Sequence, residues 1–384
     1  MPLPNITTNF KFRDGSDIGE ILVTKDYFLS IYPQLMPNFL ASNLIVMGYT
    51  PPLADSNLSA VIYSSELNWR HISGAIWPGF RHVAAIKTDG TLWTGGSNSY
   101  GELGRSGSSS FTKVGTDTDW RYVTCGSNTT AAIKNDGTLW VTGRNIERQL
   151  GLGDANNRST FTKVSLGDVR KVSAGAHSMI AISGSRLYSW GRNYNGILGI
   201  SDSFSSTIES YPKDINFSGQ IKDISMNNQV AYLITYDGGM YRWGDLSPYG
   251  GSSFTSFPRY VSNGPWKSVS AGIEHTGAIK TDGTLWMAGD NSYGSLGNGT
   301  TTDSDTFIQV PGIWKQVSCG NFMTGAIRTD GSLWTWGNNL DGQLGQGLSS
   351  GRSSIPAQTT QTGYDWRNIA CGAFGIYGIK SYEF

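Results

Sequence analysis

Runs of alternating apolar and polar residues, each interrupted by an Asp-Gly pair, recur along the chain. The stretch AIKTDGTLW occurs twice, at residues 85–93 and 278–286, and the related AIRTDGSLW occupies residues 326–334. Asp-Gly between two β-prone runs is a strong hairpin signal, because glycine adopts positive φ at little cost. Each copy therefore predicts a strand, a tight turn and a second strand.

Two other signatures accompany these hairpins and define a longer repeat. In the first signature, a large apolar residue is followed by (R/K)xV or (R/K)xI, and this pattern occurs seven times. The second signature is LWxxG, and a looser NxxGxLG motif follows most of its copies. The seven copies related to LWxxG are NLIVMG (43–48), TLWTGG (91–96), TLWVTG (138–143), RLYSWG (186–191), GMYRWG (239–244), TLWMAG (284–289) and SLWTWG (332–337). Successive repeats are spaced by about 45 to 52 residues, which is the length of a four-stranded propeller blade.

We therefore predict an all-β fold, a seven-bladed β-propeller over residues 43–384. The last repeat reaches the C-terminus without its own LWxxG unit, and NLIVMG near the start supplies the missing one. One blade is thus expected to combine strands from both ends of the chain. Such pairing closes the ring and removes open sheet edges.

Residues 1–42 lie outside the repeats and are predicted to form a short N-terminal arm. The alternating residues 9–12 precede a turn at Arg13-Asp14-Gly15, which predicts a small hairpin. The following TKDYFLSIYPQLMP predicts a short helix that Thr24 caps and Pro33 ends. The arm either packs on the propeller or docks it onto a larger assembly. The candidate docking residues are Phe10, Phe12, Tyr27, Phe28 and Ile31.

The composition agrees with a turn-rich β protein and narrows the range of functions. Charged residues make up 15% of the chain, below the quarter usual in soluble domains, and glycine accounts for 50 residues. Lys+Arg and Asp+Glu are both 29, so no excess of positive charge favours a nucleic-acid partner. The first residues, MPLPNITTNFKF, show neither a signal-peptide pattern nor an apolar span. We expect no nucleic-acid partner, no membrane span and no ordinary secretion.

The residues that could carry chemistry form no recognisable catalytic or metal motif. Twelve of the 13 Trp occupy repeat positions, and each of the three Cys precedes a repeat glycine. Side chains repeated in this way pack blade against blade, and a free Cys there is a small buried hydrophobe. His82, His177 and His275 lie in different repeats, without Ser or Asp at triad-like offsets. We expect no enzyme activity, no cofactor and no metal.

Four loops depart from the repeat, and departures are where a propeller carries function, because the consensus positions are used for packing. They are residues 72–82, 199–219, 244–264 and 345–366. One interpretation is that these are drifted surface loops. The other is that the first and third form a contact surface, since loop aromatics suit proteins or sugars. The candidate contact residues are Trp77, Pro78, Tyr249, Phe254, Phe257 and Tyr260.

The stretch AIRTDGSLWTWGNNLDGQLGQG (326–347) resembles the repeat of the regulator of chromosome condensation family, and the resemblance covers roughly residues 43–384. The family implies a seven-bladed β-propeller. The founding member's guanine-nucleotide exchange activity would need a wedge-like insertion, which is not recognisable here. A light-sensing branch has repeated GWRHT motifs, whereas this chain has a single GFRHV at residues 79–83.

The chain also resembles the virion proteins of tailed phages that carry such repeats, because an arm similar to VTKDYFLSIYPQLMP precedes their propellers. This resemblance implies a non-catalytic structural protein of a tail, fibre or capsid decoration, made in the host cytoplasm without a signal peptide. The arm would contact other virion proteins. The propeller would contact a host-surface protein, a glycan or further copies of the chain. The alternatives are a secreted protein- or carbohydrate-binding propeller and, less favoured, a guanine-nucleotide exchange factor.

Overall fold

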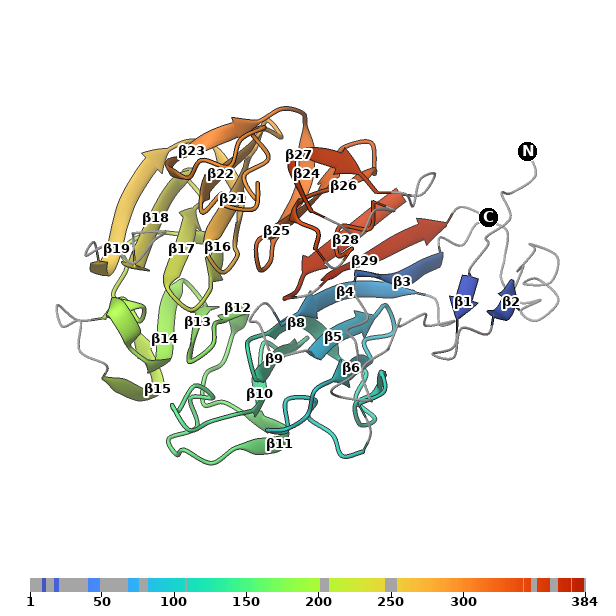
Figure 1. Cartoon of the computed structure of the whole chain (residues 1–384). Helices are drawn as coiled ribbons and strands as arrows, with labels where there is room; N and C mark the ends of the chain where they lie inside the picture. Colours follow the sequence, from blue (N-terminus) through green and yellow to red (C-terminus); the bar gives the residue numbers. More distant parts are fainter. Residues whose placement is uncertain are drawn as a thin grey trace. The chain divides into compact units, whose positions relative to one another are not determined.

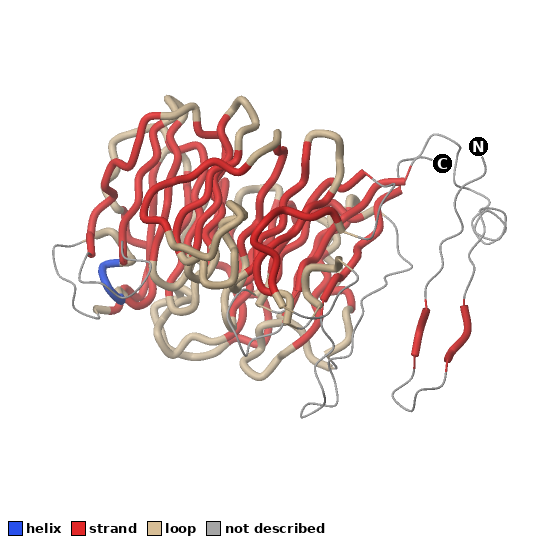
Figure 2. Tube along the Cα trace, turned by 45° about the horizontal axis from the view of Figure 1, so that its top comes forward, coloured by secondary structure: helices blue, strands red, loops and turns tan. Residues whose placement is uncertain are grey.

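The computed structural model is built almost entirely from β-strands, with one short 3-10 helix, η1 (Tyr194–Gly196), in the part it describes (Figure 2). It describes residues 9–11, 17–20, 41–48, 68–75, 82–107, 109–200, 207–245, 254–340, 342–346, 351–359, 365–373 and 375–382. The chain divides into a small unit of residues 1–41 and 382–384 and a large unit of residues 42–381. No helix within the described ranges is long and apolar enough to cross a membrane.

The small unit contains the predicted hairpin. Strand β1 (Asn9–Lys11) pairs antiparallel with β2 (Asp17–Glu20), and Phe10 lies opposite Gly19. This pair lies where the hairpin of the arm was predicted, and the predicted turn at residues 13–15 lies outside the described residues. The predicted helix lies outside the described residues, as do Phe12, Tyr27, Phe28 and Ile31.

The large unit is a β-propeller whose blades follow one another around a ring (Figure 1). Six blades are four-stranded antiparallel sheets in which sequence order is spatial order. Blade 1 consists of β4 (Trp69–Gly74), β5 (His82–Lys87), β6 (Leu92–Gly96) and β7 (Thr112–Lys113). Blade 2 consists of β8 (Trp120–Cys125), β9 (Thr129–Lys134), β10 (Leu139–Gly143) and β11 (Arg158–Lys163). Blade 3 consists of β12 (Val169–Ala174), β13 (Ser178–Ser183), β14 (Arg186–Arg192) and β15 (Ile208–Asp214). Blade 4 consists of β16 (Ile221–Met226), β17 (Val230–Thr235), β18 (Gly239–Asp245) and β19 (Phe254–Asn263). Blade 5 consists of β20 (Trp266–Ala271), β21 (His275–Lys280), β22 (Leu285–Gly289) and β23 (Ser304–Val310). Blade 6 consists of β24 (Trp314–Cys319), β25 (Met323–Arg328), β26 (Leu333–Asn338) and β27 (Arg352–Gln358).

The structure has six blades of four strands where the sequence predicted seven blades, one of them assembled from both ends of the chain. The seventh repeat forms a three-stranded sheet of β28 (Asp365–Cys371), β29 (Gly375–Tyr382) and β3 (Ala41–Gly48). This sheet takes its third strand from the start of the repeats, and no fourth strand pairs with β3 among the described residues. The ring still closes, because the Ala373 amide donates to the Ala75 carbonyl of blade 1 and Ala370 packs in one cluster with Trp69.

The inner strands hold neighbouring blades together through two repeated contacts. In the first, the basic residue of the (R/K)xV signature donates to the first carbonyl of the next inner strand, as Arg70 does to Trp120 and Lys222 to Trp266. In the second, a serine hydroxyl accepts the amide of the last residue of the next inner strand. These serines are Ser73, Ser173, Ser225, Ser270 and Ser318. Each contact satisfies a backbone group that would otherwise be buried without a partner.

The Asp-Gly phrase is the outer part of a blade hairpin, as predicted. Asp89 accepts hydrogen bonds from the amide and hydroxyl of Thr91, and that hydroxyl accepts the indole N–H of Trp93. Gly90 has φ +80°, where a side chain would be strained. Lys87 lies over the Trp93 ring, 4.4 Å from its centroid, so the phrase also fixes one cation–π contact.

Candidate functional site

The NxxGxLG motif forms a staple between neighbouring blades. The asparagine Oδ1 accepts the amide of the leucine five residues later, and each of these leucines is fully buried. The pairs are Asn98 with Leu103, Asn145 with Leu150, Asn193 with Leu198, Asn291 with Leu296 and Asn339 with Leu344. Blades 1, 2, 3, 5 and 6 therefore all carry the staple.

In the next blade, the fourth residue of the LWxxG unit contacts the staple. Trp190, Trp243 and Trp336 donate their indole N–H groups to the staple carbonyls of Gln149, Ile197 and Ser295. In blade 2 the smaller Thr142 donates its hydroxyl to the Gly101 carbonyl instead. These contacts fill the space between the blades at four of the five junctions that join blades 1 to 6.

The junction between blades 4 and 5 lacks both halves of this contact. Blade 4 has Leu246 where the staple asparagine stands in the other blades, and Gly251 where the leucine stands. Blade 5 has Ala288 where three other blades have Trp. The lost volume on both sides predicts a space between these two blades.

Blade 4 also differs in the cross-strand pair that faces this junction. Tyr232 on β17 lies directly opposite Arg242 on β18. In the other four-stranded blades this pair joins small or uncharged residues: Ala84 with Thr94, Ala131 with Val141, Ile180 with Ser189, Gly277 with Met287 and Gly325 with Thr335. The second member of each of those pairs is fully buried, whereas Arg242 is half-buried. Blade 4 has thus replaced a packing pair by a polar one.

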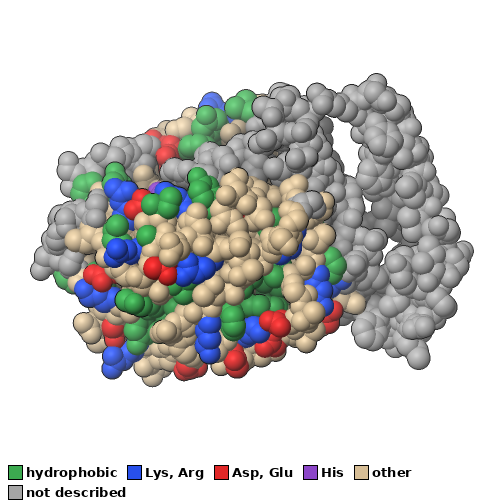
Figure 3. Space-filling view, turned by 90° about the horizontal axis from the view of Figure 1, so that it is seen from below, with side chains coloured by type: hydrophobic (Ala, Val, Ile, Leu, Met, Phe, Trp, Pro, Cys, Tyr) green, Lys and Arg blue, Asp and Glu red, His purple; other side chains and the backbone are tan. Residues whose placement is uncertain are grey.

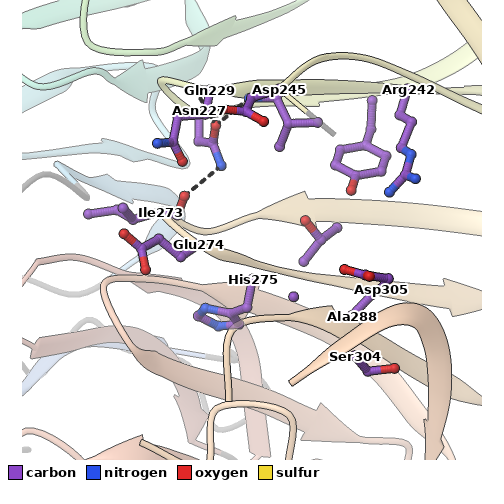
Figure 4. Close-up of a pocket in the computed structure, with 14 residues that line it drawn as sticks. Asn227, Gln229, Arg242, Asp245, Ile273, Glu274, His275, Ala288, Ser304 and Asp305 are labelled. Carbon is purple, nitrogen blue, oxygen red and sulfur yellow. Dashed lines mark hydrogen bonds between the residues drawn. The ribbon is translucent and has the colours of Figure 1, made fainter. Parts of the chain in front are cut away.

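A pocket of about 40 Å³ lies at this junction (Figure 4). Blade 4 contributes Arg242 and Asp245 on one side, and blade 5 contributes Glu274, His275 and Asp305 on the other; the remaining lining residues are Asn227, Gln229, Val230, Tyr232, Ile273, Thr276, Ala288, Gly289 and Ser304. In Figure 4, Arg242 and Asp305 lie toward one end of the pocket and Glu274 toward the other. The volume holds roughly three water molecules.

Several polar groups of the pocket have no partner within the described part of the chain. Tyr232 is only 5% exposed, and the structure records no hydrogen bond for its hydroxyl. It records none for the Arg242 guanidinium either, and no ion pair there for Arg242, Glu274 or Asp305. Of these residues only Tyr232 is buried, whereas Arg242 and Glu274 are half-buried and Asp305 is exposed. A buried tyrosine normally finds a hydrogen-bond partner for its hydroxyl, so the unpartnered Tyr232 beside a cavity indicates a place for a ligand.

Burial sets the protonation of the pocket's ionisable groups. Burial and the nearby Asp290 carboxylate raise the pKa of the Glu274 carboxyl above its usual value. Burial lowers the pKa of His275 to about 4, so its imidazole is neutral near pH 7. Its Nε2 lies 2.9 Å from the Thr324 hydroxyl, and its Nδ1 has no hydrogen-bond partner among the described residues.

The described ranges show neither a metal cluster nor a reactive thiol. No group of three or more His, Cys, Asp or Glu side chains there could hold a metal ion. Cys125, Cys319 and Cys371 are free and buried, as predicted, and burial raises the pKa of the Cys125 and Cys371 thiols to about 12. Thiols of this kind are poor nucleophiles.

The repeats can be compared with known proteins once this geometry is established. Residues 89–133, 185–229, 282–327 and 330–376 match the family model of the regulator of chromosome condensation (RCC1) repeat. A second model of the same repeat matches residues 120–149, 266–295 and 314–343, and the two together cover more than half of the chain. The chain belongs to the RCC1 repeat family.

Curated RCC1-repeat relatives match only part of the chain. The ultraviolet-B receptor UVR8 of Arabidopsis thaliana is 29% identical over 168 residues, which are 40% of this chain and 37% of the receptor. The E3 ubiquitin-protein ligase HERC2 of Homo sapiens is 26% identical over 251 residues, 59% of this chain and 5% of the ligase. The match therefore spans well under half the length of either relative.

Solved structures of RCC1-type propellers support the fold. Prp20p of Saccharomyces cerevisiae aligns with a TM-score of 0.74 at 16% identity, over 90% of this chain and 92% of that chain. Human WBSCR16 aligns with a TM-score of 0.72 at 16% identity, over 90% of this chain and 99% of that one. At such low identity the likeness concerns the fold alone.

Of the contact residues predicted from the sequence of this RCC1-repeat chain, the described ones are Phe254, Phe257 and Tyr260, and none of these three lines the pocket. Phe257 and Tyr260 are 41% and 51% exposed on β19, and Tyr260 contacts Tyr241 edge-on. Phe254 is half-buried at the start of the same strand. Trp77, Pro78 and Tyr249 lie outside the described residues. The predicted contact surface stays a prediction.

The predicted contact loop of residues 244–264 belongs to blade 4, and its sequence lacks the Asn and Leu of the NxxGxLG motif, which follow the LWxxG unit in blades 1, 2, 3, 5 and 6. Tyr232, Arg242 and Ala288 stand in strands that follow the repeat, and none of them is among the contact residues predicted from the sequence. An alignment of the blades position by position would have found them, because Arg242 is the one charged residue in its column of the described blades.

The face of the propeller drawn in Figure 3 carries Lys and Arg side chains interspersed with Asp and Glu. It shows no large block of one sign. On this face, local charge is therefore a matter of individual groups.

Proposed function

We propose that this chain is a non-catalytic binding propeller that captures a partner protein at the pocket between blades 4 and 5. The observation that carries the proposal is the coincidence of three changes at one junction. The staple is lost from blade 4, its Trp receptor is replaced by Ala288, and the pair facing the gap becomes Tyr232 and Arg242. Drift at a single position would leave a dry cavity, whereas this junction is lined by polar groups.

The size of the pocket favours a protein partner. Sites for small molecules and cofactors usually have several hundred cubic ångströms. A volume of about 40 Å³ accommodates the head group of one side chain. Such a pocket suits a partner that inserts a single anchor residue and gains the rest of its affinity from the surrounding surface.

The RCC1-repeat relatives support a binding role without specifying the partner. Prp20p was described together with its binding to Gsp1p and histones. HERC2 is a ubiquitin-protein ligase of which this chain matches 5%. For this chain, neither nucleotide exchange nor ligase activity has a supporting observation in the pocket.

A substitution that restores the missing Trp tests the proposal. Ala288→Trp would fill the pocket with the residue that blades 3, 4 and 6 carry at this position. The proteins that copurify with the full chain and with A288W are compared by mass spectrometry. We expect at least one direct partner to be lost with A288W and retained with Ile355→Ala, a control at an exposed position on β27 of blade 6. Identical partner sets, with A288W folded, would refute the proposal.

A narrower proposal is that the chain is a virion structural protein, docked by its arm and displaying the propeller to neighbouring subunits, a host-surface protein or a glycan. It rests on the resemblance of the arm sequence, and none of the relatives named above is a virion protein. The test is the protein composition of purified particles with full-length chain and with residues 1–42 deleted. Absence of the full-length chain from particles, or equal incorporation of both forms, would count against it.

A further inference from the structure

We infer that the pocket between blades 4 and 5 accepts the basic head group of a partner's Lys or Arg side chain. This inference rests on the proposed function and adds the chemistry of the anchor residue. It follows from the charge of the pocket, from an unpartnered hydroxyl inside it and from its size. These three features are independent of one another.

Negative charge outweighs positive charge at the junction. Asp245, Glu274 and Asp305 line the pocket together with a single cation, Arg242. Asp290 adds a fourth carboxylate next to Glu274. His275 is neutral near pH 7, since burial lowers its pKa to about 4. A cationic group entering the pocket would offset an excess of two negative charges among the lining residues.

The carboxylate at the end away from Arg242 is uncompensated. No described Lys or Arg forms an ion pair with Glu274, and burial and Asp290 together raise the pKa of its carboxyl. Arg242 lies toward the other end of the pocket, with Asp305 (Figure 4). The Glu274 end is therefore where a second cation would gain most and be repelled least by Arg242.

The Tyr232 hydroxyl provides an uncharged acceptor in the same pocket, on the residue opposite Arg242 in the sheet. Its residue is 95% buried and lines the pocket, and no described group bonds to the hydroxyl. A phenolic oxygen accepts hydrogen bonds from ammonium or guanidinium N–H groups, and neither head group has an acceptor of its own. Carboxylates and hydroxyls around a small cavity thus complement a group that has only donors.

The Arg242 guanidinium raises the opposite possibility, a carboxylate ligand. Two facts speak against it. The lining carboxylates would repel an anion, and a bound carboxylate would leave Glu274 uncompensated. The experiment below makes an acidic probe one of its arms, so that this possibility is an outcome of the test.

Three probes with the same backbone separate the possibilities: N-acetylarginine methylamide, its neutral isostere N-acetylcitrulline methylamide, and N-acetylaspartate methylamide. Binding of each to the full chain is followed by NMR titration. We expect saturable binding of the arginine probe, at least tenfold weaker binding of the citrulline probe and none of the aspartate probe. A288W should abolish arginine binding.

A variant of the protein with fewer carboxylates in the pocket also tests whether the pocket binds a cation. Glu274→Gln with Asp305→Asn removes two carboxylates with little change in volume, and we expect at least a tenfold loss of affinity for the arginine probe. Glu209→Gln removes a carboxylate on β15 of blade 3 and should change nothing. Thermal unfolding of each variant confirms folding.

The outcomes separate this inference from the proposed function. If A288W loses the copurifying partner while the double variant keeps it, the pocket binds a partner but not through a basic residue, and the inference fails. If A288W keeps the partner, the proposed function itself fails. Equal binding of the arginine and citrulline probes, preferential binding of the aspartate probe, or no binding of any probe would also overturn the inference.

Discussion

Tyr232 and Arg242 lie directly opposite each other on neighbouring strands of blade 4, at a pair position that the other described blades fill with small or uncharged residues. The pair faces the junction at which both halves of the interblade staple are missing. A half-buried guanidinium with no recorded partner contributes desolvation cost rather than packing. Its presence in a strand otherwise built for packing supports the proposed binding role of the pocket.

Arg242→Met is expected to change the free energy of unfolding by less than about 1 kcal/mol, because the desolvation cost that it removes is opposed by the lost attraction between the guanidinium and the lining carboxylates. Met287 already occupies the equivalent position of blade 5. The same variant should bind the arginine probe a few-fold more tightly, since one repelling cation is gone. Urea unfolding and probe titration measure the two effects.

Thr335→Met is the matched control at the equivalent position of blade 6. Thr335 is fully buried and donates its hydroxyl to the Leu344 carbonyl. Overpacking there should cost about 1–3 kcal/mol. Equal destabilisation by the two substitutions would show that Arg242 is a packing residue like its counterparts.

The staple leucines should be among the larger single contributors to the stability of the propeller. Leu198 is fully buried against blade 4, and Leu198→Ala is expected to lower the free energy of unfolding by about 2–5 kcal/mol. Leu340→Ala, at a site 58% exposed, should change it by less than about 0.5 kcal/mol. Comparable effects of the two substitutions in urea unfolding would contradict the role given to the staple.

Much of this fold could be predicted from the sequence, because its signals are local and repeated. An Asp-Gly turn between β-prone runs specifies a hairpin wherever it occurs, so the strands around Gly90 and Gly283 were predictable from a few neighbouring residues. The seventh sheet was harder. It joins β3 to β29 across almost the whole chain, and no local rule fixes how many strands such a sheet completes.

The site was predictable only to the level of a blade. The loss of the staple motif is visible in the sequence, but the pocket depends on what faces the gap from blade 5. Ala288 is an ordinary strand residue by its sequence. Its small side chain matters because the staple of the preceding blade contacts this position elsewhere in the propeller. Packing between repeats is a non-local property, which a motif does not encode.

The turn glycines should differ sharply in their tolerance of a side chain. Gly90 has φ +80°, and a Cβ there would lie 1.9 Å from the Thr118 carbonyl oxygen, so Gly90→Ala must displace backbone. Gly107 has φ +102° with nothing within 4 Å of the added Cβ. Gly107→Ala should cost only the conformational strain, about 1 kcal/mol, and Gly90→Ala distinctly more. Thermal unfolding of both variants decides, and equal shifts in Tm would contradict the expectation.

The propeller should lose stability in mild acid because it buries neutral histidines. Burial lowers the pKa of His275 to about 4 from an unfolded value near 6.5, and burial also lowers the pKa of His82. The unfolded chain therefore binds more protons between these values. The stabilisation is fully present above pH 6.5 and is lost as pH falls toward 4. For His275 the loss between pH 7 and pH 4.5 is on the order of 2 kcal/mol.

His275→Met isolates this contribution, because Met323 occupies the equivalent position of blade 6. The difference in free energy of unfolding between pH 7 and pH 4.5 should be smaller in H275M than in the original chain by about the same 2 kcal/mol. Carboxylates titrate in both proteins and cancel in the comparison. The measurement is urea unfolding at the two pH values. An unchanged pH dependence in H275M would show that the folded protein binds a proton at His275 as readily as the unfolded chain does.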